Sequence, residues 1–490
     1  MAHHSGNDLH STHPPRRCLN HFMDATAGRF VLPFFQTRVS VVKQASANRA
    51  YEPWISGALN QKPLTFKEGE MRHKKWFGVF VLAVVLAGLL IAGPAAAQDK
   101  VFKLGVLGPF TGPAAKSGTE MKHAATMAVD NFGGRIGDYK IELVYIDDQS
   151  DPAKGTNAYA EAIERKGVQA GILNWNTAVT VAIQPMLAKY KVPHFFCMGA
   201  GKAANDKYQS LPAEERYLIM KGWPIPQKLV VGYVELLNYA EEKGIWKPQK
   251  KLAALWGEDT DWGRSLVGGM AKGLTENGWE IFTEEYFDLK KTDFYPYINK
   301  CKQAGVTLLA GSSSGVASVS AIIKQQREIG FKGLVIADGL GWVGDWYKMT
   351  GRSSDGVLDM QPQLATPAQK AWVEKFKSRF KYDPSPSAAG QSYDYTNFFA
   401  KIAKRAIEKY GELNSETITK IGREEVAEGK LTYDRADGAL MHARYGTDAA
   451  NRPDPKISPA DFFFPVIQYQ KGDGYNVFPE EVKQAELVVR

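Results

Sequence analysis

Polar and aromatic side chains gather in six short segments of this sequence, each lying between a stretch typical of a strand and one typical of a helix. The segments are 109–112 with Ser117, 174–177, 199–201, 258–262, 312–314 and 338–342. Free N–H groups and the positive dipole end of a helix suit a carboxylate, and tryptophan offers a flat surface for packing on a ligand. The chemistry that these residue types indicate is the binding of a small polar organic molecule.

Each segment also has a purely structural interpretation. Serine, threonine and asparagine ahead of a helix are commonly ordinary caps, and Trp175, Trp262, Trp342 and Trp346 can be core residues. Open parallel sheets bind ligands beyond the carboxyl ends of their strands. Six such segments in register therefore favour a binding site over six unrelated caps.

Sequence signatures of enzymes and metal sites are missing from this chain. It has no Gly-x-Gly-x-x-Gly after the first expected strand, no phosphate-binding loop and no Gly-x-Ser-x-Gly turn. The adjacent acids Asp147 and Asp148, and the pair Asp259 and Asp261, fit strand ends and helix caps better than proton transfer. None of three histidines has a second His or Cys at ligand spacing: His123, His194 and His442. The sequence therefore predicts a protein that is not an enzyme and that has no catalytic residues, cofactor or metal site.

The segments that must position these residues alternate between strand and helix patterns. A first series has strands at 102–107, 139–146, 168–173 and 192–197 and helices at 118–132, 152–166 and 178–190, with Asp151 and Pro152 as a helix start. A second series occupies 227–337, after a proline-interrupted stretch at 223–226. Strands separated by helices form parallel sheets, so the chain is expected to be an α/β protein of two similar lobes.

Composition and charge narrow the function further. The 490 residues are 44% hydrophobic and 23% charged, an ordinary globular composition. The formal net charge is +8, but residues 98–490 hold 50 basic and 48 acidic side chains. The excess of positive charge therefore belongs to the first 97 residues, and a nucleic-acid partner is not expected.

The region before residue 98 has the layout of a secretory signal. Residues 71–97 comprise a cationic start, an apolar stretch and an Ala-x-Ala site, so export to the periplasm with cleavage after Ala97 is expected. An uncleaved membrane anchor is the alternative. Residues 1–70 carry five of the nine histidines and no sustained periodicity, and we interpret them as an extension introduced by the gene model, with Met71 as the initiator.

Four motifs in a fixed order resemble the leucine/isoleucine/valine-binding family of periplasmic solute-binding proteins of ABC importers. They are LGVLGPFTGP at 104–113, YIDDQSDP at 145–152, NTA at 176–178 and VP at 192–193. The resemblance covers about 101–445. It implies a type I periplasmic binding protein, with two Rossmann-like lobes joined by three crossovers and a ligand cleft between them. The lobes would comprise 98–223 with 361–445, and 224–360 with 446–490.

The resemblance also implies roles for particular residues. Thr177 matches the hydroxyl residue that holds a ligand carboxylate, Ala200 lies in a stretch that adds main-chain contacts, and Trp262 matches the aromatic residue of the second lobe. Asp338 matches the acid that takes an ammonium group. Ser117 departs from the family, where the amino-acid binders commonly have tyrosine, and Ser150 replaces a disulfide cysteine. The remaining candidate ligand-binding residues are Trp175, Asn176, Ser313 and Trp342.

These arguments predict the solute-binding component of an ABC importer, working by hinge closure with a cognate permease and ATPase in the inner membrane. An amino acid is the favoured ligand. An aromatic acid or an amide remains an alternative, because a serine at 117 makes room and the expected site is rich in tryptophan. A ligand sensor of the same fold is a further alternative.

Overall fold

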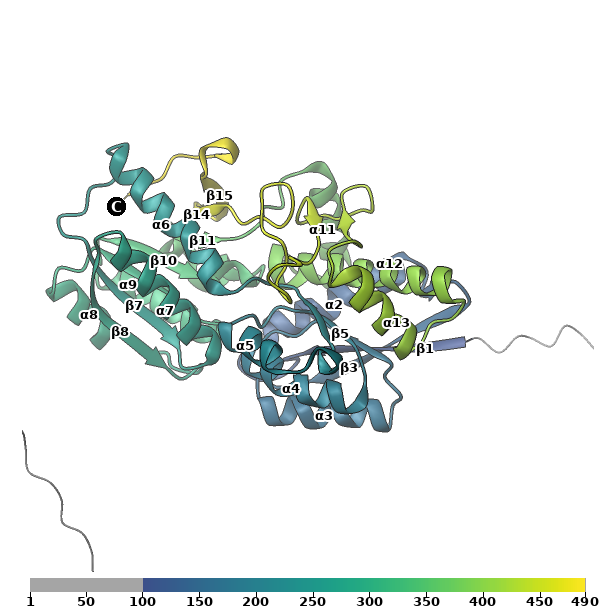
Figure 1. The fold of residues 1–490 in the computed structure, drawn as a ribbon. Helices are drawn as coiled ribbons and strands as arrows, with labels where there is room; N and C mark the ends of the chain where they lie inside the picture. Colours follow the sequence, from purple (N-terminus) through teal and green to yellow (C-terminus); the bar gives the residue numbers. More distant parts are fainter. Residues whose placement is uncertain (1–99, 490) are drawn as a thin grey trace, which may run out of the picture. The chain divides into compact units, whose positions relative to one another are not determined.

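The computed structural model describes residues 100–489. Two α/β lobes are built on two separate sheets (Figure 1). The signal segment expected at 71–97 and the extension expected at 1–70 lie outside the described residues. None of the helices formed by 100–489 is long and apolar enough to span a bilayer.

The first sheet has six strands in the order β2-β3-β1-β4-β5-β6. Only β2 pairs antiparallel, with β3, and the other neighbours are parallel. Its strands are β1 (Lys100–Gly108), β2 (Arg135–Ile136), β3 (Tyr139–Asp147), β4 (Ala170–Ile172), β5 (His194–Cys197) and β6 (Leu218–Lys221).

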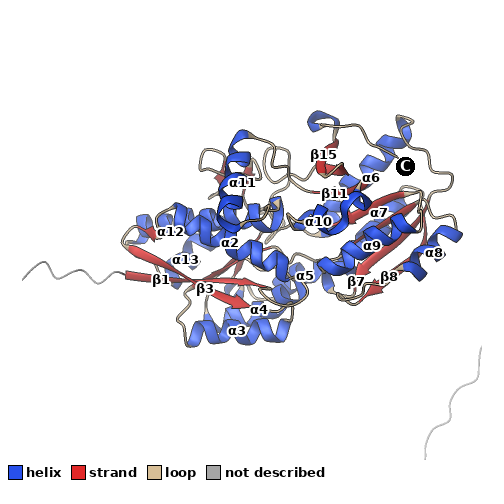
Figure 2. Ribbon diagram, turned by 180° about the vertical axis from the view of Figure 1, so that it is seen from behind, coloured by secondary structure: helices blue, strands red, loops and turns tan. Residues whose placement is uncertain are grey.

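Helices cover both faces of this sheet (Figure 2). The helices of this lobe are α2 (Ala115–Asn131), α3 (Pro152–Glu164), α4 (Thr177–Tyr190), α5 (Lys202–Ser210), α11 (Pro367–Phe380), α12 (Ser392–Tyr410) and α13 (Ser415–Ile421). α3 and α4 lie on one face, where Tyr159 and Ile183 pack against strand residues such as Leu107. α2 and α12 lie on the other face. The helix start expected at Asp151 is confirmed, because its Oδ1 accepts hydrogen bonds from two backbone N–H groups of α3, each at 2.9 Å.

The second sheet has seven strands in the order β15-β14-β11-β10-β9-β7-β8. Its strands are β7 (Leu252–Glu258), β8 (Glu280–Phe287), β9 (Leu308–Ser312), β10 (Leu334–Asp338), β11 (Val357–Met360), β14 (Val466–Gln470) and β15 (Asp473–Phe478). The strands from β8 to β11 are parallel, and the two last strands add to the edge antiparallel. Every residue of β7, β9 and β10 is buried, as is typical of parallel strands covered on both faces.

Its helices are α6 (Pro226–Glu242), α7 (Asp261–Glu276), α8 (Tyr295–Gln303), α9 (Val316–Glu328) and α10 (Trp346–Thr350). α8 and α9 share one apolar cluster with the sheet, whereas α6 and α7 belong to a larger cluster that also includes the core of the first lobe. The shorter elements are β12 (Tyr433–Asp434), β13 (Arg444–Tyr445), η1 (Ala213–Glu215), η2 (Leu340–Trp342), η3 (Gly351–Ser354), η4 (Pro386–Gln391), η5 (Gly422–Val426) and η6 (Glu480–Val482).

The chain passes between the two sheets three times, after β6, after β11 and between β13 and β14. The last passage contacts the first lobe through a buried ion pair, in which Lys221 Nζ lies 2.8 Å from Asp454 Oδ1. Asn205 Nδ2 also donates to Asp454 at 2.9 Å. Residues 446–454 were expected to belong to the second lobe. Asp454 contacts both lobes, because Lys228 Nζ of α6 also lies 3.1 Å from its Oδ2.

Candidate functional site

Four tryptophans line a small cavity of about 20 Å³ between the two sheets. We call it the indole cavity, and its walls are Trp175, Asn176, Met198, Trp223, Glu258, Trp262, Ser314 and Trp342. This is room for about one water molecule, so an organic solute enters only if the walls contributed by the two lobes move apart.

The carboxyl ends of six parallel strands place these residues. The loops after β4, β5 and β6 carry the residues from the first lobe, and the ends of β7, β9 and β10 carry those from the second. Backbone groups are unpaired beyond the ends of parallel strands, and the crevice there is the general ligand site of open α/β sheets. The cavity thus lies where the sequence analysis expected binding residues.

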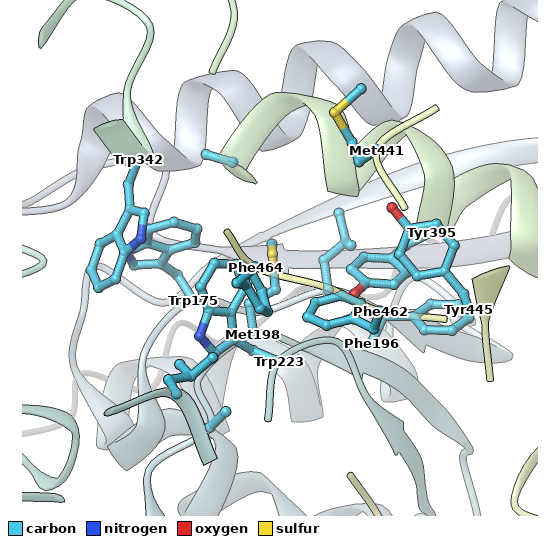
Figure 3. Packing of buried hydrophobic residues seen from close by; sticks show 14 of the residues in the cluster. Trp175, Phe196, Met198, Trp223, Trp342, Tyr395, Met441, Tyr445, Phe462 and Phe464 are labelled. Carbon is cyan, nitrogen blue, oxygen red and sulfur yellow. The ribbon is translucent and has the colours of Figure 1, made fainter. Parts of the chain in front are cut away.

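Trp342 is the centre of the aromatic wall. Its ring centroid lies 5.4 Å from that of Trp175, 5.6 Å from that of Trp262 and 6.3 Å from that of Trp223. Figure 3 shows Trp342 beside Trp175, with Trp223 and Phe464 grouped next to them. The interplanar angles of 61° to 89° are edge-to-face arrangements, which aromatic pairs favour. Rings from both lobes therefore meet at this cavity.

Glu258 provides the carboxylate in the wall of the indole cavity. It is the last residue of β7 and is buried. Thr260 Oγ1 donates to its Oε1 at 2.7 Å, and Ser314 donates to its Oε2 through Oγ at 2.8 Å and through the backbone N–H. Burial raises the pKa of Glu258, while these hydrogen bonds lower it. Among residues 100–489, no lysine or arginine belongs to the cavity wall.

Three polar atoms of the cavity residues have no hydrogen-bond partner within residues 100–489. They are the indole Nε1 atoms of Trp223 and Trp342 and the amide Oδ1 of Asn176, all buried. A buried donor or acceptor without a partner costs about 1–3 kcal/mol. Two donors and one acceptor are thus available to a polar ligand.

Hydrogen bonds join the two lobes at two places. Lys202 N at the start of α5 donates to Ser265 Oγ of α7 at 3.0 Å. Next to it, a Cβ added to Gly201 would lie 2.8 Å from Asp261 O, so the two backbones approach too closely for a side chain. Elsewhere Gly344 N of the second lobe donates to Glu120 Oε1 of α2 at 2.8 Å.

Of the nine residues that the sequence analysis selected, the structure brings four together in the cavity wall: Trp175, Asn176, Trp262 and Trp342. The other five lie outside it. Ser117 is buried in α2, and Ser313 Oγ contacts Ser318 Oγ at 2.7 Å near the start of α9.

Thr177 and Ala200 have partners within the first lobe. Gly201 N donates to Thr177 Oγ1 at 2.9 Å, which fixes the 199–201 loop against the start of α4. The carbonyl of Ala200 accepts a hydrogen bond from Lys221 Nζ at 3.2 Å. Neither residue is among those that form the cavity wall.

Asp338 is also separate from the cavity wall. Its Oδ2 accepts a hydrogen bond from Tyr233 at 3.0 Å, and its Oδ1 is buried without a partner in the described part of the chain. Burial, and then the neighbouring carboxylate of Asp359, raise its pKa well above the ordinary value. The Trp342 ring packs on Gly339, directly after Asp338; Gly339 has φ +104°, and a Cβ there would lie 2.8 Å from the ring. These surroundings disfavour an ionised Asp338 that could pair with the ammonium group of a ligand.

Sequence reasoning did not select four of the wall residues as ligand-binding: Met198, Trp223, Glu258 and Ser314. Glu258 and Ser314 lie in segments singled out for their polar residues, but no pattern distinguished them from their neighbours. Trp223 precedes Pro224 and was interpreted as part of a connection between lobes. Its ring could be placed at the cavity only by the tertiary structure. Among residues 100–489, no group of three or more His, Cys, Asp or Glu side chains could hold a metal ion.

Comparison with known proteins gives a family match and several relatives. Residues 101–451 match the family described as "Periplasmic binding protein". The "Leucine-, isoleucine-, valine-, threonine-, and alanine-binding protein" of Pseudomonas aeruginosa is 24% identical over 386 residues, 75% of this chain and 93% of that protein. "Leu/Ile/Val-binding protein homolog 6" of Brucella abortus is 26% identical over 226 residues, 46% of this chain and 54% of the relative. The chain thus spans about half the length of the Brucella relative.

Solved structures with similar folds include proteins with two kinds of ligand. A solute-binding protein of an ABC transporter from Rhodopseudomonas palustris, in complex with 3,4-dihydroxybenzoic acid, has a TM-score of 0.63 and 19% identity, covering 77% of this chain and 95% of its own. A leucine-binding protein from Thermotoga maritima has a TM-score of 0.58 and 20% identity, and the match covers 76% of this chain and 97% of that protein.

Proposed function

The chain belongs to the periplasmic binding protein family, and on that premise we propose that it is the solute-binding component of an ABC importer. The expected fold class, a type I periplasmic binding protein with two α/β lobes, is confirmed by the similar solved structures and by the two sheets. We propose that it works outside the cytoplasm, that it is exported with cleavage after Ala97, and that it delivers its ligand to a membrane permease with an ATPase. It binds and releases the ligand without turnover.

For the ligand, we propose a small organic solute of the amino-acid class, with its ammonium group at Glu258. The observation that carries this proposal is the buried carboxylate of Glu258 in a cavity wall to which residues 100–489 add no lysine or arginine. A buried charge without a counter-charge is costly, and a cationic ligand group would supply one. The free indole N–H groups of Trp223 and Trp342 suit the ligand carboxylate. Asp338 lies outside the cavity wall and accepts a hydrogen bond from Tyr233, so we give it no part in binding.

An aromatic acid is the second candidate ligand. Four indole rings offer it stacking surface, and the Rhodopseudomonas protein of similar fold is in complex with such an acid. An ionised Glu258 would repel the carboxylate of an aromatic acid. Binding of such an acid therefore requires a protonated Glu258, and burial favours this form because it raises the pKa of Glu258.

Isothermal titration with amino acids, amides and aromatic acids, followed by two substitutions, tests this proposal. Glu258→Gln should weaken binding of an amino acid by about 2 kcal/mol, a typical value for a hydrogen bond to a charged group. Asp338→Asn should leave the affinity nearly unchanged. Asp394→Asn is the matched control, because Asp394 is a buried acid that accepts bonds from Leu440, Met441 and Tyr445 away from the cavity.

Three results would contradict parts of the proposal. Tighter binding of an aromatic acid in Glu258→Gln, with no binding of amino acids by the unchanged protein, would reject the amino-acid class. A large loss in Asp338→Asn would restore Asp338 as the partner of the ammonium group. Normal uptake of the identified ligand by cells that lack the protein would favour a sensor of the same fold over a transport component.

A further inference from the structure

The two hydrogen-bonded contacts between the lobes differ in chemistry. At one of them, the backbone N–H of Lys202 donates to the hydroxyl of Ser265 at 3.0 Å, so both groups are uncharged. At the other, the backbone N–H of Gly344 in the second lobe donates to Oε1 of Glu120 in α2 at 2.8 Å. The second contact therefore depends on a carboxyl group, whose charge changes with pH.

The segment that carries Gly344 also carries part of the cavity wall. Trp342 lies 5.4 Å from Trp175 and 6.3 Å from Trp223 of the first lobe, centroid to centroid. Gly344 follows two residues later and is packed closely on the first lobe, because a Cβ there would overlap the carbonyl oxygen of Asp383. When the lobes part and Trp342 leaves the other two rings, Gly344 leaves Glu120 as well.

The carboxyl group of Glu120 can keep this contact with or without its proton. Glu120 is 3% exposed, and its Oε2 accepts hydrogen bonds from the backbone N–H of Ser385 at 2.9 Å and from the Ser385 hydroxyl at 2.5 Å. A proton on Oε2 can be donated to Ser385 Oγ, while Oε1 still accepts from Gly344. The neutral form thus keeps the bond between the lobes and avoids the cost of a buried charge.

The surroundings of Glu120 favour the neutral form. Burial is the largest cause that raises its pKa to about 7, and the charge of Asp345 raises it further, while the hydrogen bonds lower it. Asp345 also belongs to the second lobe, where its carboxylate lies 3.6 Å from Lys116 Nζ of α2 and 2.9 Å from Lys348 Nζ. The lobe that moves away on opening therefore supplies both the cover and the neighbouring negative charge.

Other titratable groups on or beside the elements that pack against α2 have partners within the first lobe. They are His123, Tyr382, Asp383 and Asp394. The Tyr382 hydroxyl lies 2.9 Å from His123 Nδ1, and Asp383 Oδ1 lies 2.8 Å from Lys377 Nζ. Asp394 accepts hydrogen bonds from residues 440, 441 and 445. These partners stay together when the lobes part.

We propose that Glu120 is a proton-controlled latch between the lobes: the neutral carboxyl group holds them together over the indole cavity, and its ionisation lets them part. A carboxylate enclosed between the lobes loses its hydration and regains it on opening, so the ionised form is more stable in the open state. Closure is favoured at low pH, and this advantage is lost as the pH rises through about 7. The inference rests on the proposed solute-binding function and adds a control over access to its site.

Double electron–electron resonance without added ligand measures the open and closed populations of the purified protein from Gln98 onwards. Nitroxide labels at Lys154→Cys in α3 and Lys324→Cys in α9 mark the two lobes, because both positions are exposed while Cys197 and Cys301 are buried. A pKa that fell from about 7 to 4.5 on opening would raise the open-to-closed ratio roughly 25-fold between about pH 5.5 and about pH 8. We expect a rise of at least about fivefold, because part of the cover of Glu120 comes from its own lobe.

Three substitutions assign this rise to Glu120. Glu120→Gln, which stays neutral, should give the same ratio at both pH values. Asp148→Asn is the matched control and should keep the full rise, because Asp148 is a buried acid of the first lobe whose pKa burial also raises to about 7, and its Oδ1 accepts from Ser150 N at 2.8 Å. Ser265→Ala removes the uncharged contact and should raise the ratio by the same factor at both pH values.

A fourth variant shifts the midpoint of the pH-dependent change. The Ser385 hydroxyl lowers the pKa of Glu120, so Ser385→Ala should move the midpoint to higher pH. This readout decides the question if circular dichroism shows that Glu120→Gln is not folded. A merely structural role for Glu120 would leave the midpoint where it is.

The outcomes separate the latch from the proposed function. An unchanged ratio between the two pH values, an equal rise in Glu120→Gln, a loss of the rise in Asp148→Asn or an unmoved midpoint in Ser385→Ala would each overturn the inference. Because these measurements use no ligand, such results leave the proposed function standing. That function fails instead if no solute binds in the titration screen, a result that does not depend on the latch.

Discussion

Removal of the Asp454 carboxylate should strongly destabilise the protein, since it would leave a buried lysine without its counter-charge. Lys221 is fully buried in β6 and its Nζ lies 2.8 Å from Asp454 Oδ1. Lys228 Nζ lies 3.1 Å from the other carboxylate oxygen. Burial alone would raise the pKa of Asp454, but Lys221 and Lys228 hold it below its ordinary value. The pair also attaches the third passage between the sheets to the first lobe.

The magnitude follows from the geometry. Two unit charges 2.8 Å apart attract by about 6 kcal/mol at an effective dielectric constant of about 20. Desolvation offsets part of this, and breaking a buried pair by removing one partner costs about 3–5 kcal/mol in other proteins. Lys221 Nζ would keep Ala200 O and Asn205 Oδ1 as acceptors. We therefore expect Asp454→Ala to lower the free energy of unfolding by about 3 kcal/mol.

Urea denaturation followed by circular dichroism measures this change. Asp206→Ala is the matched control, because Asp206 pairs with Lys202 at 2.6 Å while both side chains are more than half exposed, and such pairs contribute under about 1 kcal/mol. The double variant Lys221→Met with Asp454→Leu should recover most of the loss, since no unpaired charge remains. Equal losses in Asp454→Ala and Asp206→Ala would refute the reasoning.

Three further predictions concern pH, the cavity wall and closure. Burial raises the pKa of Glu120 from 4.5 to about 7, so its stabilising contribution is full below pH 4.5 and is lost as the pH rises through about 7. The free energy of unfolding of the unchanged protein should fall between about pH 5 and pH 8, and in Glu120→Gln this fall should be smaller by about 2 to 3 kcal/mol. The same pH profile in both proteins would contradict this. Thr177→Ala removes the acceptor of Gly201 N–H and should cost about 1–3 kcal/mol of stability in thermal or urea unfolding; a stability equal to that of the unchanged protein would show that this bond contributes nothing. Ligand saturation should reduce the radius of gyration in small-angle scattering, because the wall of the cavity comes from both lobes; an identical profile would argue against hinge closure.

The sequence by itself determined the elements and the region of the candidate site. Apolar periodicity and turn residues fixed the alternation of strands and helices, and local hydrogen bonding fixed starts such as that at Asp151. The sites of parallel sheets lie at strand carboxyl ends, so residue types and spacing were enough to select the segments around Trp175, Asn176, Trp262 and Trp342. These properties depend on residues close together in the chain.

Only the tertiary structure decided which of the selected residues face the cavity. Asp338 and Glu258 both end a buried strand and look equivalent in sequence, but Asp338 is held by Tyr233 beside a second carboxylate, whereas Glu258 lines the cavity. Trp223 joins the wall because the passage between the sheets folds back against Trp342. Burial, pKa and side-chain direction depend on neighbours distant in the chain, which packing brings together and local sequence patterns do not encode.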